Sequence, residues 1–171
     1  MQTGMIEPIQ TANVTLPLDQ FFVLEAWGAP PADTALTFKP GRRRTVVLRH
    51  GPPDNTVFVE LTLPPEVFPD TTVDSVRLAI TVRPGVYGLT ITCAPAFTDG
   101  AILRFKYPVH FAAPAAASQK YGNPAMFERA LGLGVQLPDG RFQLLPSTRP
   151  AADNLQATIP GPGVYIVAAP R

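Results

Sequence analysis

Residue types that usually bind metals or carry catalysis are few in this 171-residue sequence, and their spacing matches no common site. Its two histidines, His50 and His110, would ligate a metal only together with Asp54 or Asp99. No two of these residues lie at the short spacing that is typical of a metal-binding segment. We therefore predict no resident metal, and we expect each histidine to be exposed or capped.

Nucleophilic and nucleotide chemistry is equally poorly represented. The single cysteine, Cys93, shares the apolar phase of its segment with Leu89 and Ile91, so we expect a buried, unreactive thiol. No serine lies in a Gly-x-Ser-x-Gly or a Ser-x-x-Lys motif. The glycines at 132 and 134 are followed by a strand-like run and not by a helix, which argues against a phosphate-binding loop. The sequence therefore predicts a protein that is not an enzyme and has no cofactor.

Four carboxylates, Glu60, Glu66, Asp70 and Asp74, are close enough in sequence to face one another across strands. Glycosidase chemistry requires two carboxylates at a defined separation, and nothing in their sequence spacing indicates one. Asp70 and Asp74 are also candidate calcium ligands, but the residues around Asp70 are typical of a turn. We assign all four to turns and to solvent.

The charge balance excludes a general binder of polyanions. Fourteen Lys and Arg oppose 13 Asp and Glu, so the net charge is +1. The one charge run, Arg42, Arg43 and Arg44, is a candidate anion contact that an anionic lipid or a nucleic acid could use. Its alternative role is to keep a strand edge solvated, because charged edges resist aggregation. We predict no nucleic-acid partner.

Aromatic residues near the N-terminus suggest a second kind of function. Trp27, Phe21 and Phe22 would form a platform for a sugar ring if they were exposed together. The alternative is that they pack in the core. A carbohydrate- or other ligand-binding module therefore stays open beside the function that we favour below.

The elements that position these residues are strands. Apolar and more polar residues alternate with a period of two, which is typical of half-buried strands, and turn residues bound each run. The clearest segments are 57–63, 76–82, 87–93 and 103–111, and the others are 13–16, 20–27, 35–39, 44–50, 155–159 and 164–168. Asp139-Gly140 predicts a tight hairpin between 134–138 and 141–146. We predict an all-β antiparallel sandwich of about eight to ten strands, with Pro108 marking an edge strand.

One region breaks this period. Residues 112–131 are expected to form a long cross-over connection with one short helix, capped by Asn123 and started by Pro124. Residues 1–12 have no core pattern, so we predict an N-terminal arm followed by a single domain over 13–171.

The compartment is suggested by composition. No apolar run approaches the roughly 20 residues of a membrane-spanning helix, and the first ten residues show no signal peptide. One cysteine, 21 prolines and few charges favour an extracytoplasmic location, periplasmic or secreted, over a cytoplasmic one.

Three stretches resemble a known family. Val-Glu-Leu-Thr-Leu-Pro-Pro-Glu-Val-Phe-Pro-Asp-Thr-Thr at 59–72 resembles an element of the zona-occludens/netrin-receptor type β-sandwich domain, which occurs in ankyrins and netrin receptors and in related bacterial envelope proteins. Leu-Arg-Phe-Lys-Tyr-Pro-Val-His-Phe at 103–111 is similar to a later strand of that domain. The run 136–147, followed by 163–169, resembles its closing hairpin and last strand.

The resemblance spans roughly residues 42–169 and implies a β-sandwich that binds other proteins or holds domains in place. The family's usual Gly-Ala-Leu is Glu66, Val67 and Phe68 in this chain. Some members cut themselves near the end of the fold, but the corresponding Gly161-Pro162-Gly163 has no nucleophile, so self-cleavage is not implied.

We therefore predict a non-catalytic β-sandwich that acts by contact with other proteins, as an accessory or structural subunit of an extracytoplasmic or membrane-associated assembly. The arm and the cross-over connection carry apolar residues that suit such contacts. The candidate contact residues are Met5, Ile6, Ile9, Tyr121, Met126 and Phe127.

Overall fold

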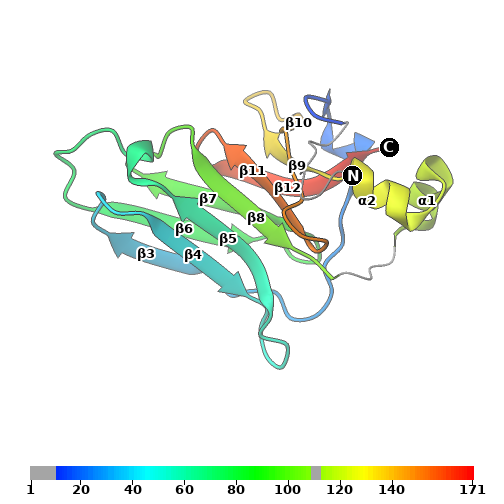
Figure 1. The fold of residues 1–171 in the computed structure, drawn as a ribbon, viewed down its shortest axis with the longest axis horizontal. Helices are drawn as coiled ribbons and strands as arrows, with labels where there is room; N and C mark the ends of the chain where they lie inside the picture. Colours follow the sequence, from blue (N-terminus) through cyan, green and yellow to red (C-terminus); the bar gives the residue numbers. More distant parts are fainter. Residues whose placement is uncertain (1–10, 109–112) are drawn as a thin grey trace, which may run out of the picture.

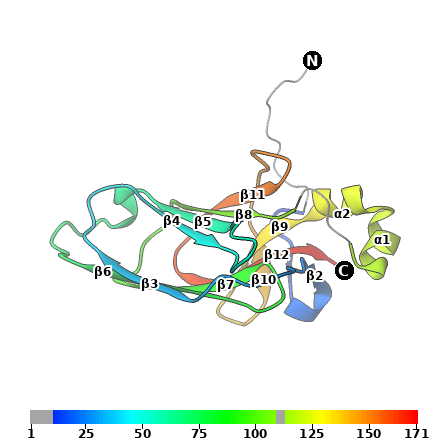
Figure 2. The same cartoon turned by 90° about the horizontal axis from the view of Figure 1, so that it is seen from below.

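Two antiparallel sheets face each other in the computed structural model, which describes residues 11–108 and 113–171 (Figures 1 and 2). The larger sheet contains β1 (Thr15–Leu16), β2 (Phe21–Val23), β3 (Thr34–Phe38), β6 (Val76–Val82), β7 (Gly88–Ala94), β9 (Gly132–Gln136), β10 (Phe142–Leu144) and β12 (Gly163–Pro170). The smaller sheet contains β4 (Arg44–Arg49), β5 (Val57–Leu63), β8 (Ala101–Lys106) and β11 (Asn154–Ile159). The all-β sandwich predicted from the sequence is confirmed.

The order of strands determines which edges are free. The larger sheet runs β1-β10-β9-β12-β7-β6-β3, with β2 also paired to β12, and the smaller runs β11-β8-β5-β4. Twelve strands are present among the described residues, more than the eight to ten expected, and three of them, β1, β2 and β10, are only two or three residues long. Consecutive strands β3 and β4 are both edges, one in each sheet.

The edge assignment drawn from Pro108 is wrong. Strand β8 ends at Lys106, two residues before this proline, and it pairs with β5 on one side and β11 on the other. Pro108 therefore does not interrupt a ladder, and it carries no information about edges.

The alternating pattern generates the core between the sheets. On β6, for example, Val76, Leu78, Ile80 and Val82 are buried, and the residues between them are more exposed. Strand β5 departs from strict alternation, because Phe58 is buried as well as Val59. A register shift between β4 and β5 turns Phe58 inward, although strict alternation with Val57 and Val59 would place it on the more polar side.

The predicted hairpin is present. β9 and β10 pair antiparallel, and Gly140 lies in the turn between them with φ +90°. Only glycine adopts this left-handed conformation readily, which explains the strength of the Asp-Gly signal. Asp139 reinforces the turn, because its Oδ1 accepts a hydrogen bond from the Arg141 N–H at 3.0 Å.

The cross-over connection contains two helices where one was expected. The Ala-rich stretch forms α1 (Ala115–Tyr121), and α2 (Pro124–Ala130) follows at once. Alanine is the strongest helix former, so its run overrides the loop that we predicted. Asn123 caps α2 as expected, its Oδ1 accepting a hydrogen bond from the Met126 N–H at 2.9 Å. Both helices lie at one end of the sandwich (Figure 1).

The burial of Phe127 generates a stability prediction. Its ring is 0% exposed and meets Phe22 edge-on at 6.1 Å between ring centroids. We expect Phe127→Ala to lower the free energy of unfolding by about 3–5 kcal/mol, because it leaves a cavity in the core. Met126→Ala, one residue away and 44% exposed, should change it by less than about 1 kcal/mol. Urea unfolding of both variants measures this, and equal effects would contradict the core role of Phe127.

Candidate functional site

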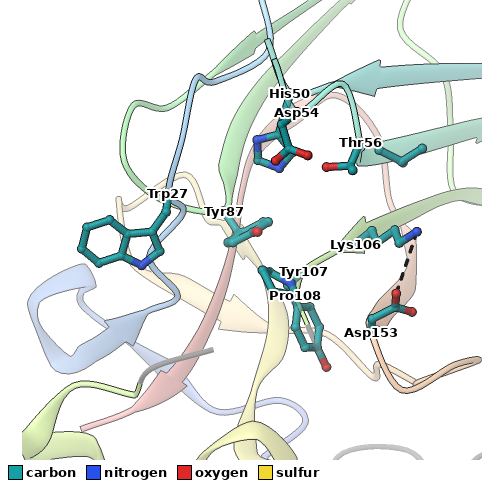
Figure 3. Close-up of a pocket in the computed structure, with 10 residues that line it drawn as sticks. Trp27, His50, Asp54, Thr56, Tyr87, Lys106, Tyr107, Pro108 and Asp153 are labelled. Atoms are coloured by element: carbon teal, nitrogen blue, oxygen red, sulfur yellow. Dashed lines mark ion pairs between the residues drawn. The ribbon is translucent and has the colours of Figure 1, made fainter. Parts of the chain in front are cut away.

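A hollow of about 300 Å³ opens at the end of the sandwich where β4 and β8 end. Loops and strand ends that are far apart in the sequence form its walls (Figure 3). We call it the Trp27 pocket, and its lining residues are Trp27, His50, Asp54, Thr56, Val57, Tyr87, Lys106, Tyr107, Pro108 and Asp153. A concave site that combines aromatic rings with a few polar groups is the usual form of a binding site.

Aromatic packing makes the floor of the pocket rigid. Tyr87 and Tyr107 are both buried, each 2% exposed. The Tyr87 ring stacks on Phe58 with 5.0 Å between centroids and 7° between the planes. Phe58 in turn meets His50 and Phe105 edge-on, at 5.2 Å and 5.8 Å. Since these rings come from both sheets, the floor is part of the core that joins the sheets.

Trp27 stands at the rim and is 73% exposed. Figure 3 shows its indole beside Tyr87, on the side of the pocket away from Lys106. The backbone is tied on both sides of it: the Ala26 N–H donates to the Gly85 carbonyl and the Gly51 N–H donates to the Ala29 carbonyl, each at 3.0 Å. The indole is therefore held at a defined place while its ring remains in solvent.

Several polar groups of the pocket already have partners. Lys106 Nζ forms an ion pair with Asp153 Oδ2 at 3.8 Å, and Asp153 Oδ1 accepts a hydrogen bond from Asn154 at 2.7 Å. His50 Nδ1 lies 3.3 Å from the Ala29 carbonyl oxygen. The buried histidine is therefore capped by the Ala29 carbonyl, one of the two states expected for it, and it supports the loop that carries Trp27.

Burial dominates the chemistry of the two tyrosines. It raises the pKa of Tyr87 to about 12, and the negative charge of Asp54 adds to the effect. Burial also raises the pKa of Tyr107 to about 12. The hydrogen bond from Arg149 Nε, 3.3 Å from the Tyr107 hydroxyl oxygen, lowers this pKa, and Glu128 raises it. Both phenols stay protonated at neutral pH and act as hydrogen-bonding groups, not as bases.

The arginines singled out in the sequence lie at the opposite end of β4 from the pocket. Arg42, Arg43 and Arg44 are all exposed, in and just after the turn that joins β3 to β4. The Arg44 guanidinium carbon lies 4.6 Å from the centroid of the Phe38 ring, a cation–π contact that covers the edge of the core. They therefore form a separate surface.

The predicted contact residues of the cross-over connection differ in how far they are buried. Phe127 is in the core, which corrects its assignment as a partner contact, because a fully buried ring offers no surface. Tyr121 is half-buried and its hydroxyl donates to the Pro170 carbonyl at 2.5 Å, so it ties α1 to β12. Met126 is exposed and stays a candidate. Met5, Ile6 and Ile9 lie outside the described residues.

The other residues that the sequence offered for metal binding, catalysis or sugar binding do not form a common site. Within 11–108 and 113–171, no three His, Cys, Asp or Glu side chains are placed to hold a metal ion. His110 lies outside the described residues. Cys93 is half-buried, less than expected, and burial raises its pKa, which favours the unreactive thiol. Phe21 and Phe22 are buried, so Trp27 alone of the predicted aromatic platform faces solvent.

Comparisons with protein-family models, with curated proteins and with solved structures found no match to this chain. The resemblance noted from the sequence therefore stays a prediction. Neither helix in the described part of the chain has the length and apolar character needed to cross a membrane.

Sequence reasoning missed most of the pocket. Tyr87 and Tyr107 carry the same alternating signal as any strand residue, and nothing local marks them as a site. Lys106 and Asp153 are far apart in the sequence and meet because β8 pairs with β11, with Lys106 opposite Asn154. No signal in a single sequence gives that register.

The raised pKa of Tyr87 predicts a loss of stability in alkali. The unfolded chain releases this proton near pH 10 and the folded chain near pH 12, so the folded state binds more protons in between. The free energy of unfolding should therefore fall across this range, and Tyr87→Phe should remove about 1.4 kcal/mol per pH unit of that slope. Urea unfolding of both proteins from about pH 8 to pH 12 measures it. Parallel curves would show that Tyr87 is not protected.

Proposed function

We propose that this protein is a non-catalytic β-sandwich that acts by contact with another protein. Its role would be that of an accessory or structural subunit in an extracytoplasmic or membrane-associated assembly. The observation that carries the proposal is the exposure of Trp27, the largest apolar side chain, at 73% on the rim of a preformed hollow. Tryptophan is the residue type most enriched among the energetic centres of protein interfaces.

The energetics favour covering this side chain. An aromatic side chain buries roughly 150–250 Å² when it is enclosed, and each Å² of apolar surface removed from water contributes about 25 cal/mol. The tethered backbone around Trp27 reduces the entropy that a partner must remove on binding. The Lys106–Asp153 pair beside the hollow supplies the polar rim that such interfaces have.

The polar groups of the pocket favour a protein over a sugar. Lys106, Asp153, His50 and Tyr107 are each engaged within the chain. Sugar recognition requires many side chains that hydrogen-bond hydroxyl groups, whereas a protein anchor requires mainly apolar surface. The resemblance to a family whose members mostly bind proteins supports the same choice, and composition supports the extracytoplasmic location.

A carbohydrate-binding module is the second candidate. The observation that favours it is that the exposed indole lines the same pocket as Asp54 and Thr56, which are also exposed. An open aromatic face in one pocket with hydroxyl and carboxylate groups suits a single sugar ring.

The test is Trp27→Ala in the full chain, with a photo-cross-linking residue at Thr56, expressed in the source cells. We expect Thr56 to cross-link to one defined protein, and we expect Trp27→Ala to weaken that complex by about 30-fold or more, as for a central interface residue. Its midpoint of thermal unfolding should not change, because the indole is in solvent. Affinity measured with the purified partner gives the fold-change.

Asp74→Ala is the control, because this side chain is also exposed but lies just before β6, at the end of the sandwich away from the pocket. Monomer-sized particles after gentle purification, with no cross-link from Thr56, would contradict protein contact. Quenching of Trp27 fluorescence by a sugar, lost in Trp27→Ala, would establish the second candidate instead.

A further inference from the structure

The β4 edge of the smaller sheet is a second surface built for contact. β4 pairs with β5 alone among the described residues, so its other side is unpaired. It contains no proline, so each of its six residues keeps the N–H that a ladder needs. An unpaired edge of this length accepts a further strand from another chain.

The centre of this edge is apolar and open. Val47 points away from the core and is 42% exposed, one of three large apolar side chains that are exposed in the described structure. Val46 and Leu48, on either side of it, are buried against the core. A strand added beside β4 would cover Val47 and continue the sheet without disturbing the core.

Both ends of the edge are positively charged. Arg44 begins β4 and Arg49 ends it, and Arg42 and Arg43 precede it in the turn. The ion pairs of the described residues join other groups: Arg104 to Glu60, Lys106 to Asp153, and Arg141 to Asp139. These four guanidinium groups therefore have no carboxylate partner within the part of the chain that the structure describes.

Two acidic groups on β5 and in the loop that follows it are already engaged. Glu60, which stands opposite Val47 on β5, pairs with Arg104 at 3.7 Å. Asp70 lies in the connection between β5 and β6, at the end of the sandwich where β4 begins. It accepts hydrogen bonds from the Thr72 N–H and hydroxyl at 2.9 and 2.6 Å. Neither of these two carboxylates therefore pairs with an arginine of the β4 edge.

The positive charges at both ends of β4 indicate what kind of segment can pair with its free edge. Antiparallel pairing of two copies of β4 would place Arg44 of each copy beside Arg49 of the other. Like charges that face each other across strands are destabilising. A segment with acidic ends and an apolar centre gains attraction at both ends instead. We propose that the β4 edge receives an extended segment of a partner protein that has acidic residues at both ends and β-branched residues between them.

This inference rests on the proposed function, since it assumes that the protein acts by contact with proteins, but it uses the unpaired backbone of β4 and not the Trp27 pocket, which begins beyond Arg49 at His50. The probe is an end-blocked octapeptide with two glutamates at each end and Thr-Val-Val-Thr between them. We expect it to bind the full chain and to shift and protect the amides of residues 44–49 in nuclear magnetic resonance spectra. The same peptide with lysines for glutamates should bind at least about tenfold more weakly.

The Arg44→Glu and Arg49→Glu double variant should reverse this preference and select the lysine peptide. Circular dichroism checks that the double variant folds. If it does not fold, the single variants Arg44→Gln and Arg49→Gln, which keep hydrogen-bonding capacity, replace it in the test. Each should weaken binding of the glutamate peptide. A glutamate peptide with proline in place of its central valines should not bind, because it cannot form the ladder.

Trp27→Ala separates the two proposals. It should leave peptide binding unchanged. A chain with Trp27 intact that gives no Thr56 cross-link but still binds the peptide would overturn the Trp27 contact alone. Three results would overturn the edge proposal: no binding of the glutamate peptide at millimolar concentration, equal binding of both peptides, or amide shifts outside 44–49.

Discussion

Contact between aromatic rings of the two sheets is the interaction on which the rest of this structure depends. Phe58 comes from the smaller sheet and stacks on Tyr87, which precedes β7 of the larger one. The Tyr87 backbone is also fixed, because its N–H donates to the Leu24 carbonyl and its carbonyl accepts from the Val167 N–H, both at 2.9 Å. Tyr87 therefore connects the segment that follows β2, strand β12 and the opposite sheet. These contacts hold the floor of the pocket in place.

This arrangement separates two kinds of surface along β4. At one end, His50 packs against the aromatic stack and supports the loop of Trp27. At the other, Arg44 covers Phe38 at the open side of the sandwich. The first surface offers a rigid apolar anchor and the second an unpaired backbone with charged ends. Both are ways in which a protein binds another protein without chemistry of its own.

The two proposed contacts differ in the physics of their specificity. An indole on a preformed hollow selects a partner by shape and by the apolar area that it removes from water. An added strand gains affinity from backbone hydrogen bonds that any sequence can make, so charge at its ends must supply selectivity. A subunit with both surfaces would hold two neighbours through separate contacts, one at the Trp27 pocket and one along β4.

The sequence alone determined the sandwich, the Asp139-Gly140 hairpin and the start of α2 at Asn123, because alternation, turn chemistry and capping act between residues close in the chain. It did not determine the inward turn of Phe58, the burial of Phe127 or the exposure of Trp27. Those depend on strand register and on which surfaces meet, so only the tertiary structure decided them. The Trp27 pocket belongs to the second group, since its lining comes from segments that meet only once both sheets are paired.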